Sequence, residues 1–218
     1  MTFHRNSQKR YYIPGAMCFI TMNTRDRQPF FKEDILCRLF LDEIDICRVI
    51  KECGIIAYKV NPDHIHIIIQ PSGKANYSEC IRSLRTNFSR NVNRVIERSG
   101  DDMDPERIIA KTVEKKRPIY NPDAVKPGHV TRSDAAFTEM IKRHSELLNA
   151  YRDQFRKKYH GILCMPVFRW QSRFHDHIIR NKDDLANHIR YLEYQWINHG
   201  LRENKWLWIR EDFTDMGK

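Results

Sequence analysis

The segment NPDHIHIIIQ places two histidines, His64 and His66, two residues apart inside an apolar run. In a β-strand, residues two apart point to the same face, with Cα atoms roughly 6.5–7 Å apart. Both imidazoles could therefore bind one metal ion and leave coordination positions open for a phosphate oxygen and a third ligand. The alternative is a pair of histidines on a solvated strand face, and under either interpretation we expect both side chains to be exposed.

A second His-x-His pair, His175 and His177, falls in another segment that we expect to be a strand. The residue between them, Asp176, is charged, which indicates a less buried strand. We interpret this pair as groups that support the site or face a nucleic acid, and it is the rival candidate for metal binding.

Residues 188–201 read HIRYLEYQWINHGL and have helical periodicity. Their apolar stripe is Leu185, Ile189, Leu192 and Trp196. A second stripe about 100° away holds His188, Tyr191 and Gln195. A tyrosine that attacks a DNA phosphate forms a phosphodiester that conserves bond energy, so that the strand can be rejoined. The phenol has a reference pKa of about 10, so a metal or a histidine such as His188 would have to assist it. The alternative is that Tyr191 is simply one of nine tyrosines, placed on an ordinary amphipathic helix.

The composition favours a single domain that binds a polyanion. The chain has 218 residues, of which 41% are hydrophobic, and we expect one domain over 1–218. Lys and Arg outnumber Asp and Glu by 38 to 28, and the net charge of +10 favours nucleic acid as partner. The six cysteines form no C-x-x-C pair, which argues against a zinc ribbon. The polar start and the absence of a long apolar run lead us to expect a cytoplasmic protein without membrane contact.

The elements that must position these residues can be read from periodicity. We expect strands at 16–24, 55–61, 64–70 and 167–179, and helices at 32–53, 76–96, 133–161 and 182–199, with Gly54 ending the first helix. Four of the nine prolines fall within 99–132, so we expect an insertion at about 97–166 that carries its own helix. This order predicts an α+β fold, an antiparallel sheet with helices mainly on one face.

Four arginines of the helix at 76–96 and its end lie mostly opposite the apolar stripe: Arg82, Arg90, Arg94 and Arg98. This helix directly follows the His64 strand in the chain, so we expect these arginines to form a DNA phosphate-binding surface beside that strand. The alternative is an ordinary solvated helix surface.

Four segments together carry a family resemblance: FITMNTRDRQPFF, NPDHIHIII, WQSRFHDHIIRNKDDL and YLEYQWINHGL. In this order they resemble the single-tyrosine HUH transposases, and among these the REP-associated tyrosine transposases. The resemblance places Tyr191 at the position of the nucleophile and Gln195 at that of a third metal ligand beside His64 and His66. Two departures are the pair Gln195-Trp196, where this branch usually has Asn-Pro, and the insertion, for which we know no counterpart.

The resemblance implies a ferredoxin-like sheet, Mg²⁺ or Mn²⁺ as cofactor, and a monomer or a homodimer. It also implies cleavage of single-stranded DNA near hairpins through a 5′-phosphotyrosine intermediate, with a free 3′-hydroxyl on the other fragment. The function that we expect is therefore that of a metal-dependent endonuclease and strand transferase.

Other families fit less well. A histidine-triad nucleotide hydrolase would need a third histidine where the chain has Ile68, and a two-histidine phosphoesterase would need two H-x-(S/T) motifs. A different class stays open, namely a non-catalytic regulator that binds hairpin DNA and descends from a transposase. A metal-dependent cleavage assay on hairpin-bearing single-stranded DNA separates it from the enzyme.

Overall fold

The computed structural model describes residues 11–97, 135–160 and 165–216. The strands are β1 (Cys18–Asn23), β2 (Cys53–Asn61), β3 (His64–Pro71), β4 (His175–Ile178) and β5 (Leu207–Ile209), and the main helices are α1 (Asp34–Lys51), α2 (Tyr77–Val95), α4 (Ala135–Tyr159) and α5 (Lys182–Asn198). The strands form one antiparallel sheet in the order β4-β1-β3-β2-β5. The run β1-α1-β2-β3-α2-β4 is the ferredoxin-like arrangement, which confirms the predicted α+β fold.

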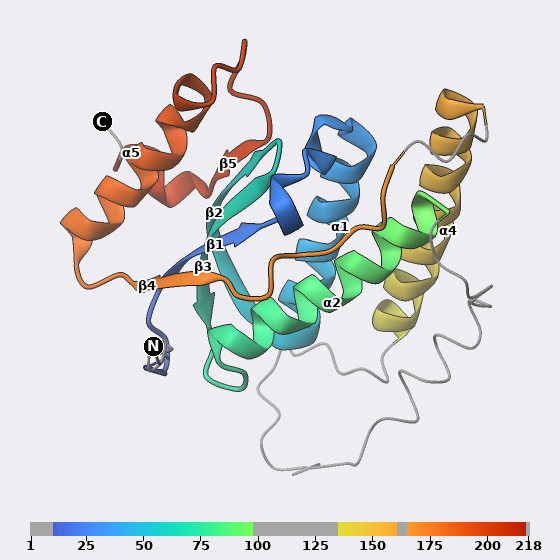
Figure 1. The fold of residues 1–218 in the computed structure, drawn as a ribbon. Helices are drawn as coiled ribbons and strands as arrows, with labels where there is room; N and C mark the ends of the chain where they lie inside the picture. The colour runs from blue at the N-terminus through green and yellow to red at the C-terminus, as the bar shows by residue number, and fades with distance from the viewer. Residues whose placement is uncertain (1–10, 98–134, 161–164, 217–218) are drawn as a thin grey trace, which may run out of the picture.

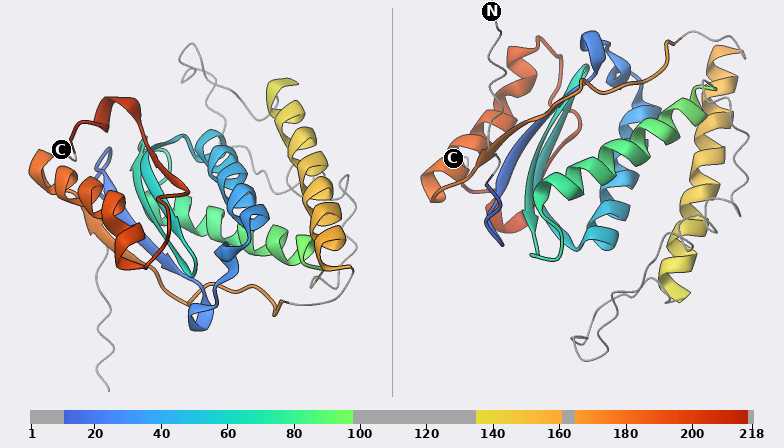
Figure 2. Two further views of the ribbon diagram at one scale, coloured as in Figure 1. Left: turned by 90° about the horizontal axis from the view of Figure 1, so that it is seen from above. Right: turned by 60° about the horizontal axis from the view of Figure 1, so that its bottom comes forward.

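The sheet lies between two layers of helices, with α1, α2 and α4 on one side and α5 on the other (Figures 1 and 2). Side chains alternate along β3, so Ile65, Ile67 and Ile69 join the core beneath α1 and α2. Ile68 points the other way and packs in a second apolar cluster with residues of α5, among them Leu185, Ile189 and Leu192. His64 and His66 share the face of Ile68 and therefore lie beneath α5.

The helix ends follow local chemistry. Asn76 caps α2 reciprocally with Glu79, because each side chain accepts a hydrogen bond from the other residue's backbone N–H. The Asn181 side chain caps α5 by accepting from the backbone N–H of Asp184. The prediction that Gly54 ends the first helix was wrong. Glu52 ends α1 in the left-handed conformation (φ 51°), and Gly54 already belongs to β2.

The strand predicted at 167–179 is much shorter in the structure, since only 175–178 pairs with β1 as β4. The residues before β4 are extended and contact both the end of β1 and α2. Trp170 forms an isolated bridge with Thr24, and Gln171 N donates to the carbonyl oxygen of Asn23 at 2.9 Å. Phe168 N donates to Asn93 Oδ1 at 2.7 Å, and Trp170 Nε1 donates to the carbonyl oxygen of Arg85 at 3.2 Å. The aromatic rings of Phe168 and Trp170 are buried in the core beneath α1 and α2, and the segment forms only an isolated bridge to the end of β1 instead of a continuous strand. The strand β5 was not predicted.

The described part of the insertion is α4, which packs against α1 and α2 on the side away from α5 (Figure 2). The Tyr151 hydroxyl donates to Asp42 Oδ2 at 2.7 Å, and His144 Nε2 lies 3.0 Å from the buried carboxylate of Glu43. The rest of the predicted insertion, 98–134 and 161–164, lies outside the described residues. A helix was therefore correctly predicted in the insertion, whereas the single-domain organisation stays a prediction.

Within the described ranges, none of the helices is long and apolar enough to span a bilayer. The five cysteines described there are buried free thiols.

Candidate metal and tyrosine site

The two histidines of β3 point at one another beneath α5. Their Nε2 atoms lie 3.1 Å apart. Two ligands that each lie about 2.1 Å from one ion, at a right angle, are about 3.0 Å apart, so the pair is spaced for a shared ion. The expectation that both side chains are exposed was wrong, because His64 is 4% and His66 3% exposed. The reason is that α5 covers this face of the sheet.

Asp63 orients the ring of His64. Its Oδ1 lies 2.6 Å from His64 Nδ1, and its Oδ2 lies 3.3 Å from Arg27 Nη1. Burial acts to raise the pKa of Asp63, but the hydrogen bond from His64 and the nearby positive charge outweigh it and hold the pKa below its usual value. Asp63 is then an ionised acceptor, so His64 Nδ1 carries the proton. His64 Nε2 keeps its lone pair, toward which Asn61 Nδ2 donates at 3.1 Å.

Thr21 has the corresponding place beside His66, with Oγ1 at 2.9 Å from Nδ1. A hydroxyl can donate or accept, so it suits the tautomer in which His66 Nε2 is free to bind an ion. Burial lowers the pKa of His66 to about 3, with His64 adding to the shift and a hydrogen bond to Gln195 opposing it. Burial likewise lowers the pKa of His64, against the effect of Asp63. Both rings are therefore neutral near pH 7, as metal ligands must be.

Two buried amide oxygens flank the histidine pair. Asn23 on β1 and Asn61 on β2 both stand opposite His64 in the sheet register. Within the part of the chain that the structure describes, Asn23 Oδ1 and Asn61 Oδ1 have no hydrogen-bond partner. Such unsatisfied buried atoms are rare. Oxygen atoms and water are the ligands that Mg²⁺ and Mn²⁺ take, so these surroundings fit a partly hydrated divalent ion.

The helix α5 brings Tyr191 and Gln195 to the same place. The Tyr191 ring packs edge-on against His66, with 5.2 Å between ring centroids. Gln195 is 2% exposed and hydrogen-bonds His66. Tyr191 is 44% exposed, so a substrate strand can reach the phenol from solvent. The structure thus assembles His64, His66, Tyr191 and Gln195 from two elements far apart in the sequence.

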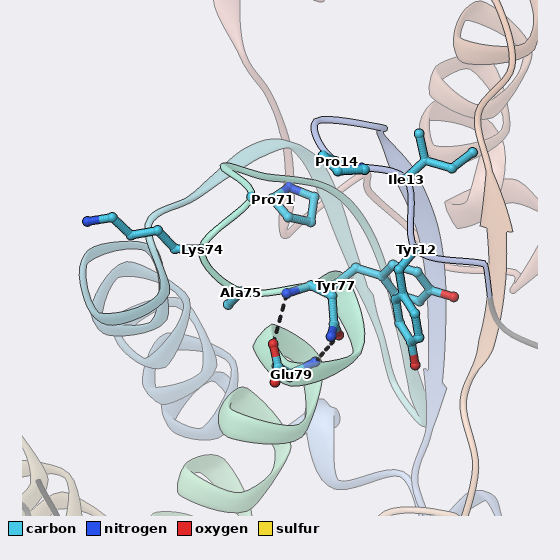
Figure 3. A pocket seen from close by; sticks show the side chains of 10 residues that line it. Tyr12, Ile13, Pro14, Pro71, Lys74, Ala75, Tyr77 and Glu79 are labelled. Carbon is cyan, nitrogen blue, oxygen red and sulfur yellow. Dashed lines mark hydrogen bonds between the residues drawn. The ribbon is translucent and has the colours of Figure 1, made fainter. Parts of the chain in front are cut away.

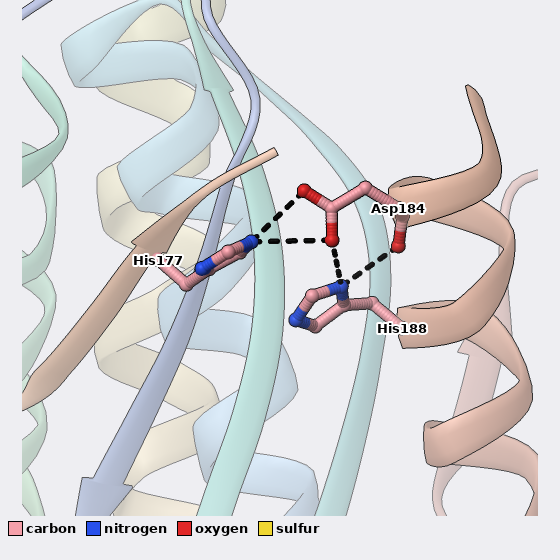
Figure 4. Close-up of side chains that lie close together, drawn as sticks. All are labelled: His177, Asp184 and His188. Carbon is pink, nitrogen blue, oxygen red and sulfur yellow. Dashed lines mark hydrogen bonds and ion pairs between the residues drawn. The ribbon is translucent and has the colours of Figure 1, made fainter. Parts of the chain in front are cut away.

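The third predicted group, the histidines around β4, is arranged differently from the expectation (Figure 4). His177 Nε2 lies 2.9 Å from Asp184 Oδ2, and His188 Nδ1 lies 3.2 Å from Asp184 Oδ1. His175 is exposed and takes no part in this cluster. Phe19 lies between the cluster and the β3 pair, with its ring 4.6 Å from that of His188 and 5.2 Å from that of His66.

The ligand atoms of His177, Asp184 and His188 lie within 4.8 Å of one another, which is close enough for a metal ion. Two features argue for a different role. The rings of His177 and His188 are stacked, so their nitrogen lone pairs run in nearly parallel planes. His188 Nδ1 also lies 2.8 Å from the carbonyl oxygen of Asp184, to which it can donate. We interpret the cluster as a polar clamp that fixes the first turns of α5 to β4.

The arginines predicted to bind DNA lie on the other side of the molecule. Arg82 and Arg90 are exposed on α2, and Arg94 Nη2 donates to Asn149 Oδ1 of α4 at 3.1 Å. Arg98 lies outside the described residues. The helix α2 does pack against β3, but on the face opposite His64, so these arginines do not border the histidine pair. Contact of these arginines with DNA stays a prediction.

The site residues that were missed in the sequence include Thr21, Asp63 and His199, besides the flanking Asn23 and Asn61. Asp63 directly precedes His64, so a carboxylate beside a candidate ligand was a usable signal. His199 follows Gln195 by four residues, a spacing that places both on one helix face. His199 Nε2 lies 3.1 Å from Gln195 Oε1. Thr21 gave no signal, since its position opposite His66 depends on the register between β1 and β3.

A cavity of about 210 Å³ lies apart from this site, at the opposite end of β3 (Figure 3). Its walls include Tyr12, Pro71 and Tyr77, and the rings of the two tyrosines lie 5.4 Å apart. None of the predicted site residues lines it.

Comparison with known proteins agrees with the resemblance noted in the sequence. Residues 16–103, which include both β3 histidines, match the family model of the IS200-like transposases. A Haemophilus influenzae protein assigned to the REP-associated tyrosine transposases is 23% identical over 199 residues, which cover 91% of this chain and 80% of that protein. A solved structure of a REP-associated tyrosine transposase bound to a REP hairpin is 20% identical, with a TM-score of 0.41 over 88% of this chain and 73% of that one. The chain is therefore similar to REP-associated tyrosine transposases, and the predicted resemblance is confirmed.

Proposed function

We propose that this protein is a divalent-metal-dependent endonuclease and strand transferase that acts on single-stranded DNA beside hairpins. The observation that carries the proposal is the convergence of His64 Nε2 and His66 Nε2, 3.1 Å apart, beneath Tyr191 and Gln195 of α5. The preference for hairpin DNA rests on the similarity to REP-associated tyrosine transposases. The net charge of +10 suits a nucleic-acid substrate.

In the cleavage step, the Tyr191 phenol oxygen attacks the phosphorus of one phosphodiester. The new bond joins phosphorus to Tyr191, and the bond from phosphorus to the 3′-oxygen breaks. The departing oxygen takes up a proton from solvent and becomes a free 3′-hydroxyl, while the 5′-phosphate stays on the tyrosine. The phenol proton needs an acceptor, and His188, one turn earlier on the same face of α5, offers an imidazole. Attack by another 3′-hydroxyl on the phosphotyrosine reverses these bonds and joins a strand.

The residues that would hold Mg²⁺ or Mn²⁺ are His64, His66 and Gln195. Bound there, the ion supplies polarisation of the phosphate oxygen and stabilises the negative charge that develops on it. The chain itself supplies orientation. Asp63 and Thr21 fix the orientation of the two imidazole rings. The apolar contacts of Ile189 and Leu192 with the sheet hold α5 in the position that places Gln195 beside His66.

The test uses Tyr191→Phe, with Tyr194→Phe as the matched control, on single-stranded DNA that carries a hairpin. Tyr194 is 55% exposed on the same helix, so its side chain is at least as accessible as that of Tyr191. With Mn²⁺ present, we expect the parent and Tyr194→Phe to form a covalent protein–DNA adduct on denaturing gels, and Tyr191→Phe to bind the DNA without forming it. An adduct in Tyr191→Phe that is lost in Tyr194→Phe would transfer the nucleophile to Tyr194. A parent protein that binds hairpins but never cleaves would favour the non-catalytic regulator.

A further inference from the structure

The Gln195 side chain must present its oxygen, and not its nitrogen, to serve as a metal ligand. The two ends of a carboxamide are similar in size, but only the oxygen carries lone pairs for an ion or a donor hydrogen. The backbone of α5 places the amide beside His66 without choosing between its ends. Another group has to select the orientation.

His199 is placed to make that selection. It caps the C-terminal end of α5, where its backbone N–H donates to the carbonyl oxygen of Gln195 at 3.0 Å. Its side chain turns back along the helix, so that Nε2 lies 3.1 Å from Gln195 Oε1. Its ring lies 4.8 Å from that of His64, at the edge of the histidine pair. Because the amide oxygen is an acceptor, His199 Nε2 must be the donor.

We infer that His199 is a positioning residue for the metal site, which holds Gln195 Oε1 toward the ion by donating one hydrogen bond to it. The inference rests on the proposed role of Gln195 as a ligand. An amide oxygen has two lone pairs, so one can accept from His199 while the other is directed at the ion. In the reversed orientation the amide N–H₂ would face His199 Nε2, and two donors would oppose each other in the imidazole tautomer that carries its hydrogen on Nε2.

His199 is a partner of a ligand and not a ligand itself. Among the described residues, His64, His66 and His199 do not form a cluster whose donor atoms all lie within 4.8 Å of one another, whereas the residues around Asp184 do. His199 instead completes a regular pattern, in which each proposed ligand has its own hydrogen-bonding neighbour. Asp63 hydrogen-bonds His64, Thr21 hydrogen-bonds His66, and His199 hydrogen-bonds Gln195. Loss of such a neighbour typically lowers metal affinity 10–100-fold.

The experiment measures Mn²⁺ affinity of the full chain by titration calorimetry, without DNA. His199→Leu removes the donor, whereas His199→Gln keeps an amide N–H₂ near the place of Nε2. His199 is exposed, so neither change should unfold the protein, and circular dichroism checks this. We expect His199→Leu to weaken Mn²⁺ binding about 10–100-fold and His199→Gln to restore most of it. In a Gln195→Ala background, His199→Leu should cause little further loss, because the oxygen that it orients is gone.

Two results would overturn this role while leaving the proposed function in place. One is parent-like Mn²⁺ affinity in His199→Leu. The other is an equal loss with and without Gln195, which would mean that His199 acts on the ion by itself. A parent protein that binds no Mn²⁺ would instead overturn the metal-dependent function together with this inference.

Discussion

Binding of Mn²⁺ should stabilise the folded chain by an amount that can be worked out beforehand. The three proposed ligands lie on β3 and α5, and Gln195 follows His66 by 129 residues (195 − 66). The unfolded chain cannot hold them together, so the ion binds essentially the folded state. At an ion concentration of about 100 times Kd, the free energy of unfolding then rises by about 2.7 kcal/mol. For a chain of this size that corresponds to a rise in Tm of about 5–11 °C.

The assay is thermal unfolding of the parent, His66→Ala and His177→Ala, each with Mn²⁺ and with EDTA. His66 is buried, so its removal lowers Tm even in EDTA, and the quantity to compare is the difference between Mn²⁺ and EDTA for each variant. We expect His66→Ala to lose this difference and His177→Ala to keep it. A difference that survives in His66→Ala and vanishes in His177→Ala would refute the reasoning and place the ion at Asp184.

Three further predictions test the packing and the charges. We expect Arg82→Gln with Arg90→Gln to make the log–log salt dependence of hairpin binding shallower by about 0.7 per arginine that contacts single-stranded DNA; an unchanged slope would show that the DNA stays on the α5 side of the sheet. Leu192→Ala should lower the free energy of unfolding by about 2–5 kcal/mol in urea titrations, since Leu192 is fully buried between α5 and the sheet; a loss below about 1 kcal/mol would contradict that packing. Burial lowers the pKa of Lys59 to about 8, so the unfolded chain binds a proton there that the folded chain has released, and this contribution to stability rises from about pH 8 to about pH 10. Lys59→Met should remove that rise in urea titrations at the two pH values, and an unchanged rise would assign it to other groups.

The sequence alone was sufficient to predict the helices and strands whose apolar residues recur at a regular spacing and whose ends carry a recognisable signal. In β3, Ile65 and Ile67 alternate with His64 and His66 and face the main core, as the period of two in a strand requires. The apolar stripe of Leu185, Ile189 and Leu192 predicted the buried face of α5. Both patterns are local, and each depends only on the geometry of a single helix or strand.

Burial of the histidines could not be predicted, because periodicity does not say which face of a sheet a helix will cover. The stripe of α5 fits either face, and its position opposite α1 and α2 comes from contacts with Ile56 and Ile68. The extent of β4 was misjudged for a similar reason. An extended segment can pair with a strand along its whole length or leave that strand to pack beside a helix. Here only isolated hydrogen bonds join residues 169–171 to the end of β1, while Phe168 and Trp170 pack against α2.

The different exposure of Tyr191 and Gln195 follows from the geometry of one helix. Residues four apart on an α-helix are separated by about 40° around its axis, so the two side chains point in similar directions without coinciding. The apolar contacts of Leu192 press the helix onto the sheet, which leaves Gln195 2% exposed beside His66. Tyr191 falls at the edge of the same contact, where its ring touches His66 and 44% of it stays exposed. A metal ligand must be held in a fixed position, whereas a nucleophile for DNA must be reachable from solvent. A single turn of α5 meets both requirements, and a rotation of the helix that buried Tyr191 more deeply would also turn Gln195 away from the histidine pair.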